Sequence, residues 1–149
     1  MQDFLKARGQ LTLSLTREDG SVEEQTVENL IVNLGLAYIV SRMKDATATA
    51  MSHMAIGTGV TAASAAQTAL GTEATRVALT SSTLVTTNVA NDALQYVATF
   101  GANVGTGAIT EAALLNAGSG GTMLARTVFS AINKGALDSL TITWKITVQ

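Results

Sequence analysis

Residues 140–148 read LTITWKITV, and apolar side chains alternate with threonine or lysine along this stretch. Successive side chains of a β-strand point to opposite faces, so the alternation predicts a strand with one buried face. The apolar face would consist of Leu140, Ile142, Trp144, Ile146 and Val148. We therefore expect Trp144, Ile142 and Ile146 to lie in a hydrophobic core.

The amino-terminal part of the chain has the same period. Leu11, Leu13 and Leu15 alternate with hydroxyl residues, and the turn sequence Glu18-Asp19-Gly20 precedes a second strand at 21–27. These features predict a charged β-hairpin over residues 9–28.

Three more strands are predicted between these two ends, separated by glycine-rich breaks. In the strand at 94–100, Tyr96 and Phe100 would join the core. In the strand at 109–115, a common face would consist of Ile109, Ala113 and Leu115. A further strand is expected at 122–129.

A single helix is predicted after Asn33, whose side chain could cap it. Its apolar stripe would consist of Leu36, Ile39, Val40 and Met43, and a short helical turn is also expected within 61–70. The whole pattern predicts a mainly β single domain, 1–149. We expect an antiparallel β-sandwich with Greek-key or jelly-roll connections, an N-terminal hairpin and one short α-helix.

The amino-acid composition argues against several classes of function. The 149 residues include no cysteine and one histidine, which excludes disulfides and thiolate metal sites and leaves little for a histidine-based catalytic site. A net charge of -2 argues against a nucleic-acid-binding surface. Residues 1–10 lack the long apolar core of a secretory signal, so we expect synthesis in the cytoplasm. The most apolar stretch, 30–40, is about half as long as a membrane-spanning helix, so we expect no membrane span. We expect no enzyme activity, no cofactor, no metal and no catalytic residues.

Two features that resemble ligand sites have simpler interpretations. Gly57-Thr58-Gly59 resembles a nucleotide-binding turn, but the lysine of a phosphate-binding loop is missing. We expect Gly57, Gly59 and Gly71 to be turn glycines, and we expect the turn at Gly57-Thr58-Gly59 to use the positive φ angles that glycine allows. His53 lies beside two methionines at the start of a probable strand, and we expect it to be a packed, hydrogen-bonded residue.

Residues 46–133 hold five charged residues, and four of them are candidates for structural ion pairs. Isolated charges in an apolar, hydroxyl-rich region are costly unless they are paired. The four candidates are Glu73, Arg76, Glu111 and Arg126. Two pairs of opposite sign would satisfy all of them, and this interpretation outweighs a catalytic carboxylate pair.

Several blocks of the chain resemble a module of tailed-bacteriophage structural proteins, found in tail-collar and tail-fibre proteins and in small stand-alone virion proteins. The resemblance covers residues 29–149. The blocks are Asn29 to Asn33, Ile56-Gly-Thr-Gly-Val-Thr-Ala-Ala, Thr68-Ala-Leu-Gly-Thr-Glu73, Arg76-Val77, Ile109-Thr-Glu-Ala112 with Leu114, and Gly121-Thr-Met-Leu-Ala-Arg126.

The resemblance implies a structural protein of the virion, assembled in the cytoplasm of the host cell. No long fibrous extension follows the module in this sequence. The resemblance therefore favours a capsid decoration or cement protein over a tail-fibre, neck or baseplate component. A host-glycan-binding sandwich ranks last, because Trp144, Tyr38 and Tyr96 fall on predicted core faces.

Few charges and unguarded strand edges favour a protein whose surfaces are covered by partners. We expect a homo-oligomer, a trimer or dimer, that also contacts the major capsid protein or a tail or neck protein, with no nucleic acid or membrane involved. The hairpin 9–28 would be either an arm onto a neighbouring virion protein or an added edge of the sandwich.

Overall fold

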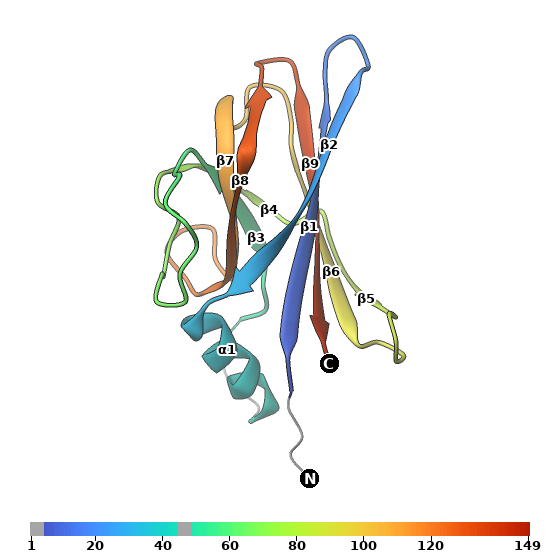
Figure 1. Ribbon diagram of the computed structural model, residues 1–149, viewed down its shortest axis with the longest axis vertical. Helices are drawn as coiled ribbons and strands as arrows, with labels where there is room; N and C mark the ends of the chain where they lie inside the picture. Colours follow the sequence, from blue (N-terminus) through green and yellow to red (C-terminus); the bar gives the residue numbers. More distant parts are fainter. Residues whose placement is uncertain (1–4, 45–48) are drawn as a thin grey trace.

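The computed structural model describes residues 5–44 and 49–149, which form nine strands and one helix (Figure 1). The first elements are β1 (Ala7–Thr16), β2 (Val22–Ile31), α1 (Asn33–Met43), β3 (His53–Gly57) and β4 (Glu73–Ala78). The remaining strands are β5 (Ser81–Val85), β6 (Ala93–Phe100), β7 (Gly107–Leu115), β8 (Met123–Lys134) and β9 (Ser139–Val148).

All nine strands belong to one antiparallel sheet in the order β4-β3-β7-β8-β2-β1-β9-β6-β5. The sheet curls into a half-barrel, and its two halves face each other across the core (Figure 1). The halves are joined where Leu30 and Ile31 of β2 pair with β8. The mainly β antiparallel class, the N-terminal hairpin and the helix are therefore confirmed. The two layers expected of a sandwich are halves of one continuous sheet.

The hairpin occupies the centre of this sheet, and both roles expected for it are wrong. β1 pairs along its length with β2 on one side and with β9 on the other. Leu11, Leu13 and Leu15 are fully buried in the main core. Residues 9–28 are thus neither an arm nor an added edge, and residues 29–149 lack their central strands without them.

The predicted core residues all lie in the main hydrophobic cluster. Trp144, Ile142 and Phe100 are fully buried, and Tyr96 and Ile146 retain 5% and 6% of their exposure. The indole Nε1 of Trp144 donates a 2.7 Å hydrogen bond to Oδ1 of Asn29 on β2. The core therefore satisfies the polar atom of its largest side chain.

The face expected for β7 is wrong at one position. The register with β8 shifts between Ile109 and Glu111, as at a β-bulge. Ile109 consequently lies in the main core, whereas Ala113 and Leu115 belong to a smaller cluster with Val32. Between the pairs Ile109–Ile132 and Glu111–Val128, β8 advances four residues while β7 advances two, and the side chains of β7 change faces across this irregularity.

Helix α1 also differs from its prediction. Val32, not Asn33, is the N-cap, and no side chain caps the helix. Gly35 is the buried residue of α1, and the helix lies so close to β8 there that a Cβ would collide with the carbonyl oxygen of Leu124. This close approach turns Tyr38 and Ile39 toward the core. Residues 61–70 form an irregular loop, so the helical turn expected there is wrong.

Candidate functional site

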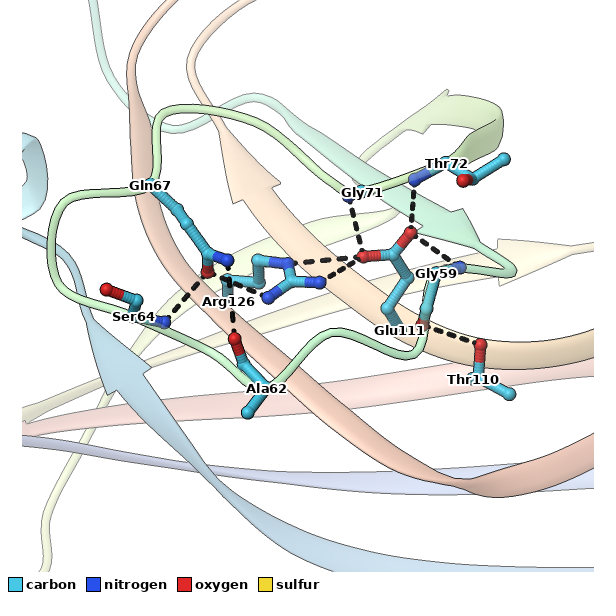
Figure 2. A network of polar contacts seen from close by, with 9 residues as sticks. All are labelled: Gly59, Ala62, Ser64, Gln67, Gly71, Thr72, Thr110, Glu111 and Arg126. Atoms are coloured by element: carbon cyan, nitrogen blue, oxygen red, sulfur yellow. Dashed lines mark hydrogen bonds and ion pairs between the residues drawn. The ribbon is translucent and has the colours of Figure 1, made fainter.

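A buried ion pair lies on the face of β7 and β8 that points away from the main core (Figure 2). Glu111 follows the register shift between β7 and β8, and Arg126 lies on the neighbouring strand opposite Ala113. Both side chains are fully buried, and Nη2 of Arg126 lies 2.6 Å from Oε2 of Glu111. The loop 58–72 covers this face, so the pair is enclosed between sheet and loop (Figure 2).

The Glu111 carboxylate accepts hydrogen bonds from both ends of this loop. The backbone N–H groups of Gly59 and Thr72 donate to Oε1 at 2.9 and 2.7 Å, and that of Gly71 donates to Oε2 at 2.9 Å. The Arg126 guanidinium adds Nε and Nη2 bonds to Oε2 at 3.1 and 2.6 Å. One side chain thus closes the loop by holding its two ends together.

Gln67 holds the middle of the loop. Its Oε1 accepts from Nη1 of Arg126 and from the backbone N–H of Ser64, both at 2.8 Å. The Thr110 hydroxyl also donates to the carbonyl oxygen of Gly59 at 2.8 Å. We call the residues drawn in Figure 2 the Glu111 network. Gln67 could not be predicted from the sequence, because a neutral amide in a polar loop has no distinguishing pattern.

The network holds the carboxylate in its charged form. Burial raises the pKa of Glu111, but the hydrogen bonds from Thr72, Arg126, Gly71 and Gly59 outweigh burial and lower that pKa below its ordinary value. A carboxylate with a lowered pKa and five hydrogen bonds is a poor general base, and it has no open face for a substrate. The arrangement serves to fix the loop.

The three glycines predicted at turns have a different role. Gly57, Gly59 and Gly71 do not adopt positive φ, so that expectation is wrong. A Cβ on Gly59 would collide with the Glu111 carboxylate, and one on Gly57 would collide with the carbonyl of Thr72. These two positions need glycine because the loop lies so close to β7. A Cβ on Gly71 would make ordinary contacts at 3.6 Å.

Gly59→Ala is expected to lower the free energy of unfolding by about 1–3 kcal/mol, the range for overpacking. The new methyl would displace Glu111 from the loop N–H groups, so amide exchange in residues 58–72 should accelerate. Urea unfolding and hydrogen-exchange mass spectrometry measure both effects. Gly71→Ala is the matched control and should change stability by less than about 0.5 kcal/mol. Equal effects of the two substitutions would contradict the close-approach explanation.

The second pair of charges lies at the edge of the sheet. Arg76 on β4 binds Glu73 through two bonds, Nε to Oε1 at 3.0 Å and Nη2 to Oε2 at 2.8 Å. Its Nη1 donates to the carbonyl oxygens of Ala117 and Gly120 at 2.8 and 2.9 Å. The four predicted charges therefore form two pairs, and this one ties β4 to the β7–β8 loop.

Other titratable residues have structural partners. The ring of His53 lies 2.8 Å from the Ser52 hydroxyl. Lys134 is almost fully buried, and its Nζ donates to the carbonyl oxygen of Gly101 at 2.8 Å. Burial lowers the pKa of Lys134, and the nearby Asp138 opposes that shift. No sequence signal marked Lys134 as buried.

Residues 5–44 and 49–149 contain no group of three histidine, cysteine or acidic side chains placed to hold a metal ion. Within the same residues, no helix has the length and apolar character that crossing a membrane requires.

Comparison of the chain with models of known families, with curated proteins and with solved structures found no match. The phage resemblance therefore rests on the residue blocks alone and stays a prediction.

Proposed function

We propose that this chain is a non-enzymatic structural protein of a tailed-phage virion, most specifically a capsid decoration protein that binds neighbouring protein subunits. The observation that carries the proposal is the apolar face that α1 leaves exposed within residues 5–44 and 49–149. Leu36, Val40 and Met43 expose 48%, 64% and 79% of their surface. Three large apolar residues in three turns of one short helix are more than a free monomer usually leaves in water.

The spacing of these residues favours a docking role. Leu36, Val40 and Met43 follow one another at four and three positions, so they lie on one face of α1. An amphipathic helix with such a face commonly binds in an apolar groove of a partner. The partner would be the major capsid protein or a second copy of this chain in a dimer or trimer.

The phage assignment is supported by the place of the resembling blocks. Gly57, Gly59, Gly71, Glu111 and Arg126 all belong to those blocks, and all lie in or against the Glu111 network. One network therefore gives a physical reason for motifs that are far apart in the sequence. A module built on this loop would need these residue types at these positions.

Two alternative functions are a tail-fibre, neck or baseplate component and a glycan-binding sandwich, and the structure supports the first better than the second. A tail-fibre, neck or baseplate component would use the same apolar helix, and the number of copies per virion separates it from a decoration protein. A glycan-binding sandwich has little support, because its aromatic platform would need exposed rings. Among the aromatic residues that the structure describes, Trp144 and Phe100 are fully buried, Phe129 and Tyr96 nearly so, and Tyr38 is half-buried.

Val40→Asp is expected to weaken binding to particles assembled without this chain by about 30-fold. Burying a valine contributes about 2 kcal/mol, and a buried unpaired carboxylate adds a penalty. Because Val40 faces solvent, the variant should keep its melting temperature. Co-sedimentation with purified particles measures the affinity.

The matched control is Val22→Asp, at an exposed valine beside the turn of the β1–β2 hairpin, which lies at the opposite end of the molecule from α1 (Figure 1). It should bind as the wild type does. Loss of binding in Val22→Asp with retention in Val40→Asp would place the docking surface on the hairpin and contradict the proposal.

A further inference from the structure

The strand β5 forms one end of the sheet, at the right-hand margin of the molecule in Figure 1. It pairs with β6 on one side. On its other side, no hydrogen bond joins the backbone of Ser81–Val85 to another of the residues that the structure describes. Four of its five residues are exposed. The edge therefore presents a row of free N–H and C=O groups, which are complementary to an added β-strand.

The sequence of this edge does not guard it against such pairing. Proteins usually protect a free edge with charged residues, with proline or with a bulge. Residues 77–91 contain no charged residue and no proline, and the register of β5 with β6 is regular over the whole strand. The edge strand at the other end of the sheet, β4, differs because it carries the Glu73–Arg76 ion pair. β5 is thus the edge that is open to a partner strand.

A second copy of β5 is the partner that fits this edge best. It offers the same free backbone groups, and it is already held extended by β6, so pairing would cost less conformational entropy than ordering a flexible peptide. Because 77–91 is uncharged, two identical strands oppose no like charges. One contact between two copies would cover both free edges at once.

We propose that two copies of this chain form a dimer by pairing their β5 strands antiparallel, across a two-fold axis at Thr83. In an isologous interface the same residues meet from both sides. The register that uses every residue of Ser81–Val85 places Thr83 opposite Thr83 of the second copy. The axis is perpendicular to the sheet, so the outer faces of the two copies stay on the same side and the two sheets join into one.

The side chain expected at the axis suits this pairing. Thr83 lies opposite Gln95 of β6 and points to the outer face of the sheet. Threonines already face each other across neighbouring strands on this face, with Oγ1 atoms 3.3 Å apart for Thr12 and Thr26 and 3.0 Å apart for Thr99 and Thr141. Such cross-strand threonine pairs stabilise a sheet.

The inner face of β5 supplies apolar contact. Leu84 exposes 62% of its surface at this edge. In the dimer it lies opposite Ser82 of the second copy, whose strand would cover it. The dimer does not depend on the virion role, and it uses a surface other than the exposed face of α1.

Sedimentation velocity over a range of concentrations tests the dimer, and the wild type should show a monomer–dimer equilibrium. Thr83→Lys places two ammonium groups opposite each other at the axis and should weaken the dimer about tenfold. The matched control is Thr16→Lys, at an exposed threonine of β1, and it should dimerise as the wild type does. Equal dimerisation by the two lysine variants, or a wild type that stays monomeric, would overturn the proposal.

The same measurement separates this dimer from docking through α1. Val40→Asp should retain the dimer even though it is expected to lose particle binding. If Val40→Asp loses the dimer and Thr83→Lys keeps it, self-association belongs to α1 and the β5 pairing is wrong. If the wild type is monomeric and Thr83→Lys loses particle binding, the edge pairs with a strand of another protein, and the proposed dimer is wrong.

Single cysteines test the register, because the chain has no cysteine of its own. Two directly opposed Thr83 residues have Cα atoms about 5 Å apart, which a disulfide can bridge. Thr83→Cys should therefore form a disulfide-linked dimer on mild oxidation, as seen by non-reducing electrophoresis. The matched control is Ser81→Cys, on the same exposed face of β5. Its two copies would lie four residues apart along the strands, about 14 Å, and should stay unlinked. Equal or stronger crosslinking of Ser81→Cys would contradict the pairing at Thr83.

Discussion

Trp144→Ala is expected to lower the free energy of unfolding by about 3–5 kcal/mol, the range for emptying a buried site of a large aromatic residue. Trp144 is fully buried on β9, which lies between β1 and β6 in the sheet. Truncation would leave a cavity facing both halves of the half-barrel and would remove the donor that satisfies Asn29 Oδ1. Urea unfolding followed by circular dichroism measures the change.

Two controls separate these contributions. Trp144→Phe keeps most of the volume but loses the 2.7 Å bond to Asn29, so it should cost less than the alanine variant. Lys145→Ala changes the next residue of β9, which points to the outer face, and should have little effect. A Trp144→Ala variant with unchanged stability would contradict the core assignment.

Glu111→Gln is expected to destabilise the protein by about 3–5 kcal/mol, because removing one partner leaves a buried unpaired charge. Arg126 would keep its charge in a fully buried position, and the N–H groups of Gly59, Gly71 and Thr72 would face a weaker acceptor. Urea unfolding at neutral pH measures the loss. The control Glu73→Gln breaks a pair that is partly exposed and should cost less than about 1 kcal/mol.

Lowering the pH should remove the contribution that the ionised Glu111 makes to the free energy of unfolding of the wild-type protein. The folded pKa of Glu111 is lowered from the ordinary value of 4.5, so its ionised form stabilises the fold above that pH. This stability is lost as the pH falls below 4.5 through the folded pKa. The difference in unfolding free energy between wild type and Glu111→Gln should therefore shrink with acid. A difference independent of pH would contradict the lowered pKa.

A double variant distinguishes the ion pair from the closure of the loop. Replacing Glu111 and Arg126 together by leucines removes both buried charges, which in many proteins restores stability. Here it should not, because the three backbone N–H groups of the loop lose their acceptor. Full recovery in the double variant would show that the loop bonds contribute little.

The strands of the core could be predicted from sequence, and two edge strands could not. β1, β6 and β9 each bury one face, so their alternation is visible in the residues themselves. β4 and β5 are the edges of the sheet, and most of their residues stay exposed or half-buried. They become strands because β3 and β6 offer hydrogen-bond partners, and no local pattern records this.

The four charges of the two ion pairs could be selected from sequence by their scarcity, but their geometry could not. The bulge after Ile109 sets which face Glu111 occupies, and the register of β7 with β8 brings Arg126 beside it. The loop glycines then follow from contact with that carboxylate. Each step depends on residues tens of positions apart.

The sequence by itself determined the strand class, the turn between β1 and β2, and the buried face of β9, because hydrophobic periodicity acts over a few neighbouring residues. Only the tertiary structure decided that this hairpin lies at the centre of the sheet, which requires β8 and β9 on its two sides. It also decided the face of α1, where the contact between Gly35 and Leu124 left Leu36, Val40 and Met43 exposed. Such contacts join distant segments, so their outcome depends on the whole chain and not on local spacing.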